Sequence, residues 1–198
     1  MLTVNGDRDV VERQLTGGEL SCPSCGGVLG RWGNACLRRV RVLGGPDAEL
    51  VPRRSRCRGC GATHVLLPAC CLLRRADAGE VIGAALEAAA AGGGRRKIAG
   101  LVGRPESTVR GWLRRFAGRA EEVRVFFTVL LARTGADPVM PAGAAGLAAA
   151  VSAIAGAAVA VAARWPHLGE VPVWAAASAA SGGLLLAPGW PGGGRNAS

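Results

Sequence analysis

The sequence predicts a mainly α-helical protein with a small β module near its N-terminus. Two Cys-x-x-Cys-Gly motifs begin at Cys22 and Cys57, and segments with alternating valine and arginine, punctuated by glycine and proline, lie between them. From Ala76 onward the apolar residues recur with a helical period. A chain of 198 residues suits one ordinary domain or two small ones, so several short modules are expected.

The β module is expected over residues 21–73. Residues 1–20 have scattered valines without a clear period, which predicts a loose N-terminal arm with at most one short strand. Residues 37–43 and 49–56 read as antiparallel strands on either side of a turn at 44–47. Strands this few and short cannot bury a core alone, so something must hold them together.

The two cysteine motifs supply that constraint as metal ligands. Cysteines three residues apart can direct both thiolates at one tetrahedral ion, and the following glycine supplies an unusual backbone angle. The sequence therefore predicts Zn²⁺ in a zinc ribbon, held by four ligands: Cys22, Cys25, Cys57 and Cys60. The 31 residues between the motifs exceed the usual spacing, which a hairpin with a long tip accommodates.

The seven cysteines fit other roles less well. A thioredoxin-like redox pair needs one such motif beside a βαβ unit, and an odd number of cysteines argues against a disulfide framework. Cys36, Cys70 and Cys71 lack a partner at ligand spacing and are expected to pack, although Cys36 or His64 could substitute for a ligand. His64 is expected to be a strand residue next to the site.

Four helices are expected in residues 74–134. The first begins after a capping box formed by Asp77 and Glu80 and ends at Gly92. The others are expected at about 95–101, 105–116 and 120–133.

Residues 95–116 match the layout of a helix-turn-helix. Ala99 is small where the second helix crosses the first, and Gly103 suits the turn. A shared apolar seam is expected from Ile98, Val102, Val109 and Trp112. With this seam buried, the side chains expected to contact base edges are Glu106, Ser107, Arg110 and Arg114. The residues expected to contact phosphates are Arg95, Arg96, Lys97, Thr108, Arg115 and Arg119.

The charge of the chain supports a polyanionic partner. It has 24 Lys and Arg against 14 Asp and Glu, a net charge of +10, and the excess lies between Cys22 and Arg119. The alternative is a generic three-helix bundle with a solvated basic face. The register of small, apolar and turn residues favours the helix-turn-helix, with double-stranded DNA as the partner.

The C-terminal third is expected to be helical and rich in alanine. A linker at 135–141 precedes an extension at 142–187 and a disordered tail at 188–198. The uncharged stretch at 142–163 is long enough to span a membrane, but 13 of its 22 residues are alanine, which favours a packing helix. Its larger residues fall largely on one helical stripe, which is expected to be the buried side: Leu147, Val151, Ile154 and Val161. The first residues lack a secretory signal, so a cytoplasmic, nucleoid-associated protein is expected, without membrane association.

Residues from about 21 to 133 carry a resemblance to known proteins. The Cys-Pro-x-Cys-Gly motif, the arginine-rich second motif with Thr63 and His64, and the segment from Gly103 to Leu113 resemble an actinobacterial family of unknown function. They are also similar to the N-terminal DNA-binding portion of insertion-sequence transposases. This resemblance implies a zinc ribbon and a helix-turn-helix associated with mobile elements, with the four cysteines carried over as ligands.

The sequence departs from a complete transposase. Such enzymes hold catalytic metal ions with a carboxylate triad, and after Arg133 the only acidic residues are Asp137 and Glu170. The expected function is therefore a non-enzymatic, sequence-specific DNA-binding protein, either a transcriptional regulator or a transposition accessory, which could form a homodimer or act with a transposase. The alternatives are a truncated transposase or recombinase and a module whose ribbon binds protein.

Overall fold

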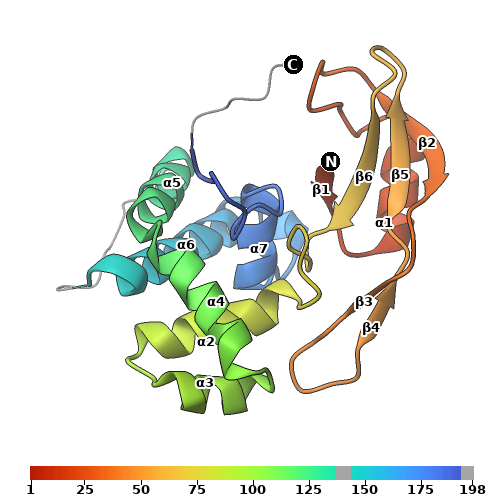
Figure 1. Ribbon diagram of the computed structural model, residues 1–198. Helices are drawn as coiled ribbons and strands as arrows, with labels where there is room; N and C mark the ends of the chain where they lie inside the picture. The colour runs from red at the N-terminus through yellow and green to blue at the C-terminus, as the bar shows by residue number, and fades with distance from the viewer. Residues whose placement is uncertain (137–143, 193–198) are drawn as a thin grey trace.

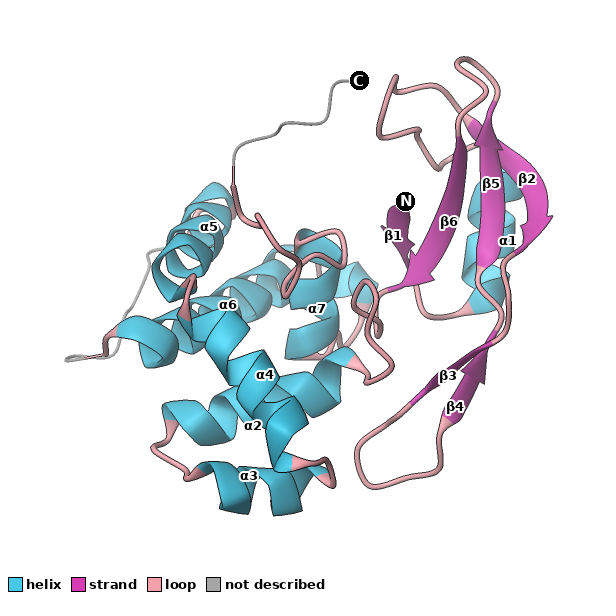
Figure 2. Cartoon of the chain, viewed as in Figure 1, coloured by secondary structure: helices cyan, strands magenta, loops and turns pink. Residues whose placement is uncertain are grey.

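The computed structural model describes residues 1–136 and 144–192. The strands gather on one side of the molecule together with helix α1, and the remaining helices form a second, larger body beside them (Figures 1 and 2). The expected mainly α fold with a small β ribbon, a helix-turn-helix and an Ala-rich helical segment is confirmed.

The β part contains a four-stranded sheet and a separate hairpin. The sheet has the order β1 (Leu2–Val4), β6 (Thr63–Pro68), β5 (Arg53–Cys57) and β2 (Leu29–Asn34); β1 is parallel to β6 and the other pairs are antiparallel. The hairpin pairs β3 (Arg38–Val40) with β4 (Ala48–Leu50). The single strand expected over 49–56 is divided, because Pro52 has no N–H for a sheet ladder.

Helix α1 (Arg8–Gly17) corrects the expectation of a loose N-terminal arm. The carboxylate of Asp7 accepts a hydrogen bond from the Asp9 N–H at 2.8 Å, and Gly18 ends the helix in the left-handed conformation at φ 70°. Val11 and Leu15 lie one turn apart and are buried with Leu29 of the sheet. Residues 1–20 are therefore part of the small core beneath the sheet.

The helical part begins with α2 (Gly79–Ala90), α3 (Arg95–Val102), α4 (Glu106–Ala117) and α5 (Ala120–Arg133). The expected capping box at the start of α2 is wrong. Ala78 is the N-cap residue and no side chain caps the helix. The Asp77 carboxylate instead forms ion pairs with Arg41 and Arg104, which lie far from it in the sequence.

The alanine-rich region forms α6 (Gly146–Arg164) and α7 (Val173–Ala180), separated by a 3₁₀ turn at Pro166–Leu168. Helix α6 packs most extensively against α5 and also contacts α2 and α7 (Figure 1). Its buried side is made mostly of alanines, not of the larger side chains expected there; of these, only Ile154 is fully buried. One buried cluster joins these helices to the helix-turn-helix.

Helix α6 is long and apolar enough to cross a membrane, with a mean hydropathy of 2.1. Within the described residues it is the one helix that meets this test, and 44% of the tested window is buried inside the protein. Its contacts with α5 and α7 are those of an internal packing helix.

The segment after α7 is ordered further than expected. The Trp190 ring packs edge-on against Phe126, with centroids 5.0 Å apart, and also contacts Phe127. The expectation of a disordered tail is therefore wrong for 188–192, and 193–198 lie outside the described residues. Most of the expected linker, 137–141, also lies outside them.

Candidate metal site and nucleic-acid interface

Each Cys-x-x-Cys-Gly motif forms the same backbone turn. In the first, the Cys22 carbonyl accepts from the Gly26 N–H at 2.8 Å, and the Cys22 N–H donates to the Gly27 carbonyl at 2.7 Å. In the second, Cys57 makes the corresponding bonds with Gly61 at 3.1 Å and Ala62 at 2.9 Å. Gly26 and Gly61 have φ values of 72° and 73°, which confirms why glycine follows the second cysteine.

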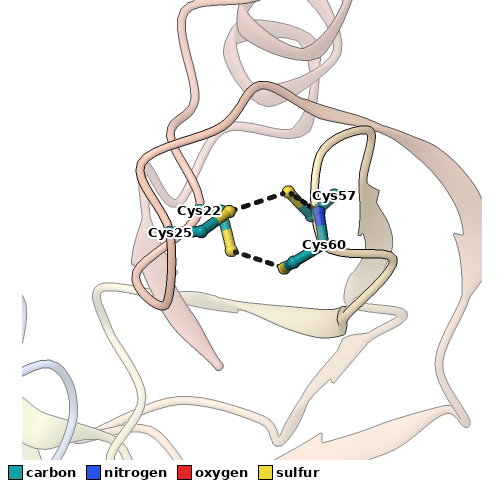
Figure 3. Close-up of side chains that lie close together, drawn as sticks. All are labelled: Cys22, Cys25, Cys57 and Cys60. Carbon is teal, nitrogen blue, oxygen red and sulfur yellow. Dashed lines mark hydrogen bonds between the residues drawn. The ribbon is translucent and has the colours of Figure 1, made fainter.

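The two turns bring the four sulfur atoms together. Figure 3 shows the side chains of Cys22, Cys25, Cys57 and Cys60 converging from two loops. The Sγ atoms of Cys22 and Cys60 are 3.8 Å apart, those of Cys25 and Cys57 are 3.4 Å apart, and all four lie within 4.8 Å of one another. A tetrahedral ion with sulfur ligands at about 2.3 Å requires sulfur separations of about 3.8 Å. The four cysteines can therefore hold a metal ion.

The surrounding backbone favours negative charge at this site. The Cys57 Sγ accepts from the N–H groups of Cys60 and Gly59, which lower its pKa to about 6 despite burial. Burial raises the pKa of Cys22, but the N–H groups of Ser24 and Cys25 and the His64 ring outweigh it and bring that pKa to about 7. The N–H of Gly27 lowers the pKa of Cys25, yet its sulfur neighbours raise it to about 11 overall. Because neighbouring thiolates repel one another, all four cysteines can be ionised together only with a cation between them.

The space around the sulfurs leaves no room for larger side chains. A Cβ atom at Gly27 would lie 3.1 Å from the Cys57 sulfur and 3.3 Å from the Cys25 sulfur. His64 Nε2 lies 3.3 Å from Cys22 Sγ, so His64 is a strand residue beside the four-sulfur group, as expected. Cys36, Cys70 and Cys71 do not belong to the group.

The helix-turn-helix has the geometry that the sequence predicts. Gly103 ends α3 in the left-handed conformation at φ 62°, and α4 begins three residues later. The seam is buried throughout: Ile98, Val102, Val109 and Trp112 are each at most 4% exposed. Ala99 is buried where the two helices meet.

The residues expected to contact DNA lie on the side of the helices that faces away from this buried seam. All four residues expected to contact base edges are exposed: Glu106, Ser107, Arg110 and Arg114. Among those expected to contact phosphates, four are exposed and Thr108 is half-buried; the exposed ones are Arg95, Arg96, Lys97 and Arg115. A shallow hollow lined by Arg95, Glu106, Ser107 and Arg110 lies between the starts of α3 and α4.

Arg119 is the exception among the expected phosphate contacts. Its Nη1 donates to the carbonyl oxygen of Ala187 at 3.1 Å and to that of Trp190. The guanidinium therefore holds the C-terminal segment against the helical part, and we no longer count Arg119 among the expected phosphate contacts.

Asp77, expected to form a capping box with Glu80, links two distant elements instead. Its carboxylate is 7% exposed and lies 2.6 Å from Arg104 Nε and 3.9 Å from Arg41 Nη1. Arg104 belongs to the turn between α3 and α4, whereas Arg41 follows β3. The nearby backbone adds two hydrogen bonds, Arg41 N–H to Ala76 at 2.8 Å and Ala78 N–H to Arg41 at 2.9 Å. Asp77 thus joins the β hairpin to the helix-turn-helix.

The buried seam, the left-handed turn and the exposed basic second helix define a helix-turn-helix DNA-binding region. The sequence model of the homeodomain-like domain matches residues 80–124, which span α2, α3, α4 and the start of α5. No curated protein and no solved structure gives a significant match to the chain.

Proposed function

We propose that this protein binds duplex DNA in a sequence-specific manner and acts as a transcriptional regulator or as an accessory of a mobile element. The observation that carries the proposal is the register of α3 and α4. It buries the whole apolar seam and exposes Glu106, Ser107, Arg110 and Arg114 together on α4. In the major groove, Arg110 suits a guanine edge and Glu106 suits the amino group of cytosine.

The start of α3 supports a phosphate partner. Three basic residues, Arg95 to Lys97, occupy its first turn, where no acidic residue and no capping side chain is present. Positive charge at the positive end of a helix dipole is unfavourable by about 0.3–1 kcal/mol per charge, and a bound anion relieves it. The hollow at this end is lined by Gly94, the three basic residues and Glu106. A DNA phosphate fits this arrangement.

For the metal site we propose Zn²⁺ as the resident ion, because four thiolates in tetrahedral spacing suit it and leave no position for a reacting molecule. When bound, the ion would cross-link the two cysteine turns. The Cys57 and Cys22 sulfurs, whose pKa values are already low, would accept it most readily.

We further propose that the chain has a cytoplasmic location and no catalytic activity, because the exposed side chains of α4 suit DNA recognition. Helix α6 is proposed to serve packing and not membrane insertion, given its buried contacts with α5. A homodimer on a two-fold symmetric site, or cooperation with a transposase, would suit the accessory role.

Selection of bound duplexes from a random pool, with the full zinc-loaded chain, tests the proposal. We expect an enriched motif of a few base pairs, with two inverted copies if the protein binds as a dimer. A variant with alanine at Arg110 and Arg114 is the informative comparison, since both residues are exposed. If the wild type enriches no motif, or if this variant enriches the same motif with equal affinity, base reading by α4 is excluded.

A further inference from the structure

The β2 edge of the ribbon sheet has a hollow that the helix-turn-helix does not explain. This open hollow of about 900 Å³ extends from β2 to the second cysteine turn, and Leu15 and Thr16 of α1 line it on one side. Its lining contains no acidic residue, and its charged members are Arg31, Arg56 and Arg58. Trp32 lies among them and is 50% exposed.

The register of β2 and β5 explains why these side chains gather. Gly30 pairs with Arg56, so the Arg56 side chain projects from the sheet face opposite to the one that buries Ser55 and Cys57. A Cβ atom at Gly30 would lie 3.4 Å from Arg58 Nε, which places the Arg58 side chain close over that strand. Arg54, two residues before Arg56, shares the same face.

Not every arginine of this region is free to bind a ligand. Arg53 projects to the other face, where it pairs with Glu12 and donates to Asn34 Oδ1 at 2.7 Å. Arg31 is held by Glu12 at 3.0 Å and by the Thr16 hydroxyl at 2.8 Å. Arg56 donates one bond, from Nε to the Gly61 carbonyl at 3.3 Å, and Arg58 has no ion pair within the described part of the chain. The guanidinium ends of Arg56 and Arg58 therefore remain available.

Trp32 indicates which ligand fits. The Arg56 guanidinium lies over the Trp32 ring, 4.7 Å from its centroid, and the indole is still 50% exposed. A large aromatic ring in water contributes nothing to the core, but it offers a stacking surface for an unpaired base. In a duplex the base faces are already covered by their neighbours, so a duplex could use the arginines but not the indole.

We propose that this face binds an unpaired stretch of a nucleic-acid strand, with a base stacked on Trp32 and phosphates at Arg56 and Arg58. The site is separate from α4, and it does not depend on sequence-specific reading of a duplex. Because Arg58 lies between the two ligands of the second turn, the metal fixes its position. Strand binding is therefore expected to require the metal-loaded protein.

Fluorescence anisotropy of the full zinc-loaded chain with a labelled oligodeoxythymidine, a labelled oligouridine and a labelled duplex tests the proposal. The Trp32→Ala variant should bind the oligonucleotides about 5- to 150-fold more weakly, the range for loss of one base–aromatic stack. Trp32→Phe should retain most of the affinity because it keeps a ring. Preference between the two oligonucleotides identifies a DNA or an RNA strand as the ligand.

Two further variants separate this site from charge effects and from the helix-turn-helix. Arg56→Ala/Arg58→Ala should lose strand binding, whereas Arg13→Ala, which removes an exposed charge of α1 that does not line the hollow, should retain it. Arg110→Ala should weaken duplex binding alone. Zinc content confirms that each variant is folded. The proposal is overturned if the wild type binds neither oligonucleotide, or if Trp32→Ala and Arg56→Ala/Arg58→Ala both bind them like the wild type and Arg13→Ala.

Discussion

Arg110 and Arg96 are two exposed arginines of the helix-turn-helix that should fail in different ways when replaced by alanine. Arg110 lies on α4 one turn after Glu106, and Arg96 lies in the first turn of α3. Neither side chain has an ion pair in the described residues, so each replacement removes a charge without breaking a contact within the protein. Any effect on DNA binding then reports on DNA contacts.

The structure sets the size of each effect. With Arg119 engaged elsewhere, four charged side chains remain as expected phosphate contacts: Arg95, Arg96, Lys97 and Arg115. At about −0.9 per neutralised phosphate, the slope of log K against log salt should be about −3.6, and Arg96→Ala should reduce it to about −2.7. Arg110→Ala should cost about 1–3 kcal/mol on the preferred site, which is roughly 5- to 150-fold in affinity.

Anisotropy titrations of the selected duplex and of its single-base variants, at several salt concentrations between roughly 50 and 200 mM, measure both quantities. Arg110→Ala should lose discrimination at one base pair, while Arg96→Ala should weaken every duplex alike. The reverse pattern, with uniform loss for Arg110→Ala and an unchanged salt slope for Arg96→Ala, would refute the orientation of α4 in the groove.

Four other perturbations test the architecture. Chelation of the metal should increase hydrogen exchange in residues 2–34 and 53–66, which contain the small separate core, while the helical circular dichroism signal of α2–α7 largely persists. Equal loss of both signals would contradict two separate cores. Acid should release the metal with a midpoint below pH 6. The N–H of Cys60 lowers the pKa of Cys57 to about 6, and a bound cation lowers that pKa further. The thiolate, and with it the metal, is lost as the pH falls through this lowered pKa. Asp77→Asn should destabilise the protein to denaturant by about 1–3 kcal/mol, since it unpairs the largely buried Arg104. Glu121→Gln, which breaks an exposed pair with Arg124, should leave the stability almost unchanged, and similar losses in the two variants would exclude a special role for Asp77. Gly83→Ala should lower the free energy of unfolding by about 1–3 kcal/mol, and with it the melting temperature, because its Cβ would overlap the Trp174 ring. Gly100→Ala, where a Cβ meets no atom within 4 Å, should be neutral or stabilising. A neutral Gly83→Ala would refute this packing.

The helix-turn-helix could be predicted nearly residue by residue because its signals are local. Expected and observed boundaries of α3 and α4 agree within one residue, and those of α5 are identical. Gly103 and Pro105 limit the backbone between α3 and α4, and the seam follows from helical geometry alone. The metal ligands could be predicted for the same reason, since each cysteine turn is complete within six residues.

Helix α1 was missed although local signals for it exist. Asp7 at the N-cap, Val11 and Leu15 one turn apart, and Gly17 with Gly18 at the end form a short helical pattern. Only two buried positions carry the period, too few to stand out among the polar residues around them. The helix is stabilised by burial against Leu29 and Leu66, which lie far along the chain.

Other features depend on contacts that no local pattern reveals. Asp77 looks like a helix cap from its neighbours, and only the fold brings Arg41 and Arg104 to its carboxylate. The buried side of α6 was predicted from its larger residues, but the close approach of α5 selects small ones. A Cβ at Gly156 would already lie 3.1 Å from Leu131 Cδ1. Packing distance, not hydrophobicity, decides which side of α6 is buried.

The junction at Asp77 has a consequence for how the two parts could act together. Val40 of β3 is 1% exposed and belongs to the core of the helical part. Strand β5 begins only a few residues after the hairpin, and it ends at the metal ligand Cys57, with Cys60 just beyond. Arg38 Nη2 also donates to the Arg75 carbonyl at 2.9 Å, so the hairpin is fixed to the helices by apolar, ionic and backbone contacts at once. A rigid hairpin of this kind sets where the ribbon lies relative to the turn before α4. If the ribbon face and α4 bind nucleic acid as proposed, breaking this junction should leave each surface intact. It should, however, lower the affinity for a substrate that has both a duplex and an unpaired strand, because the second contact would no longer be held near the first.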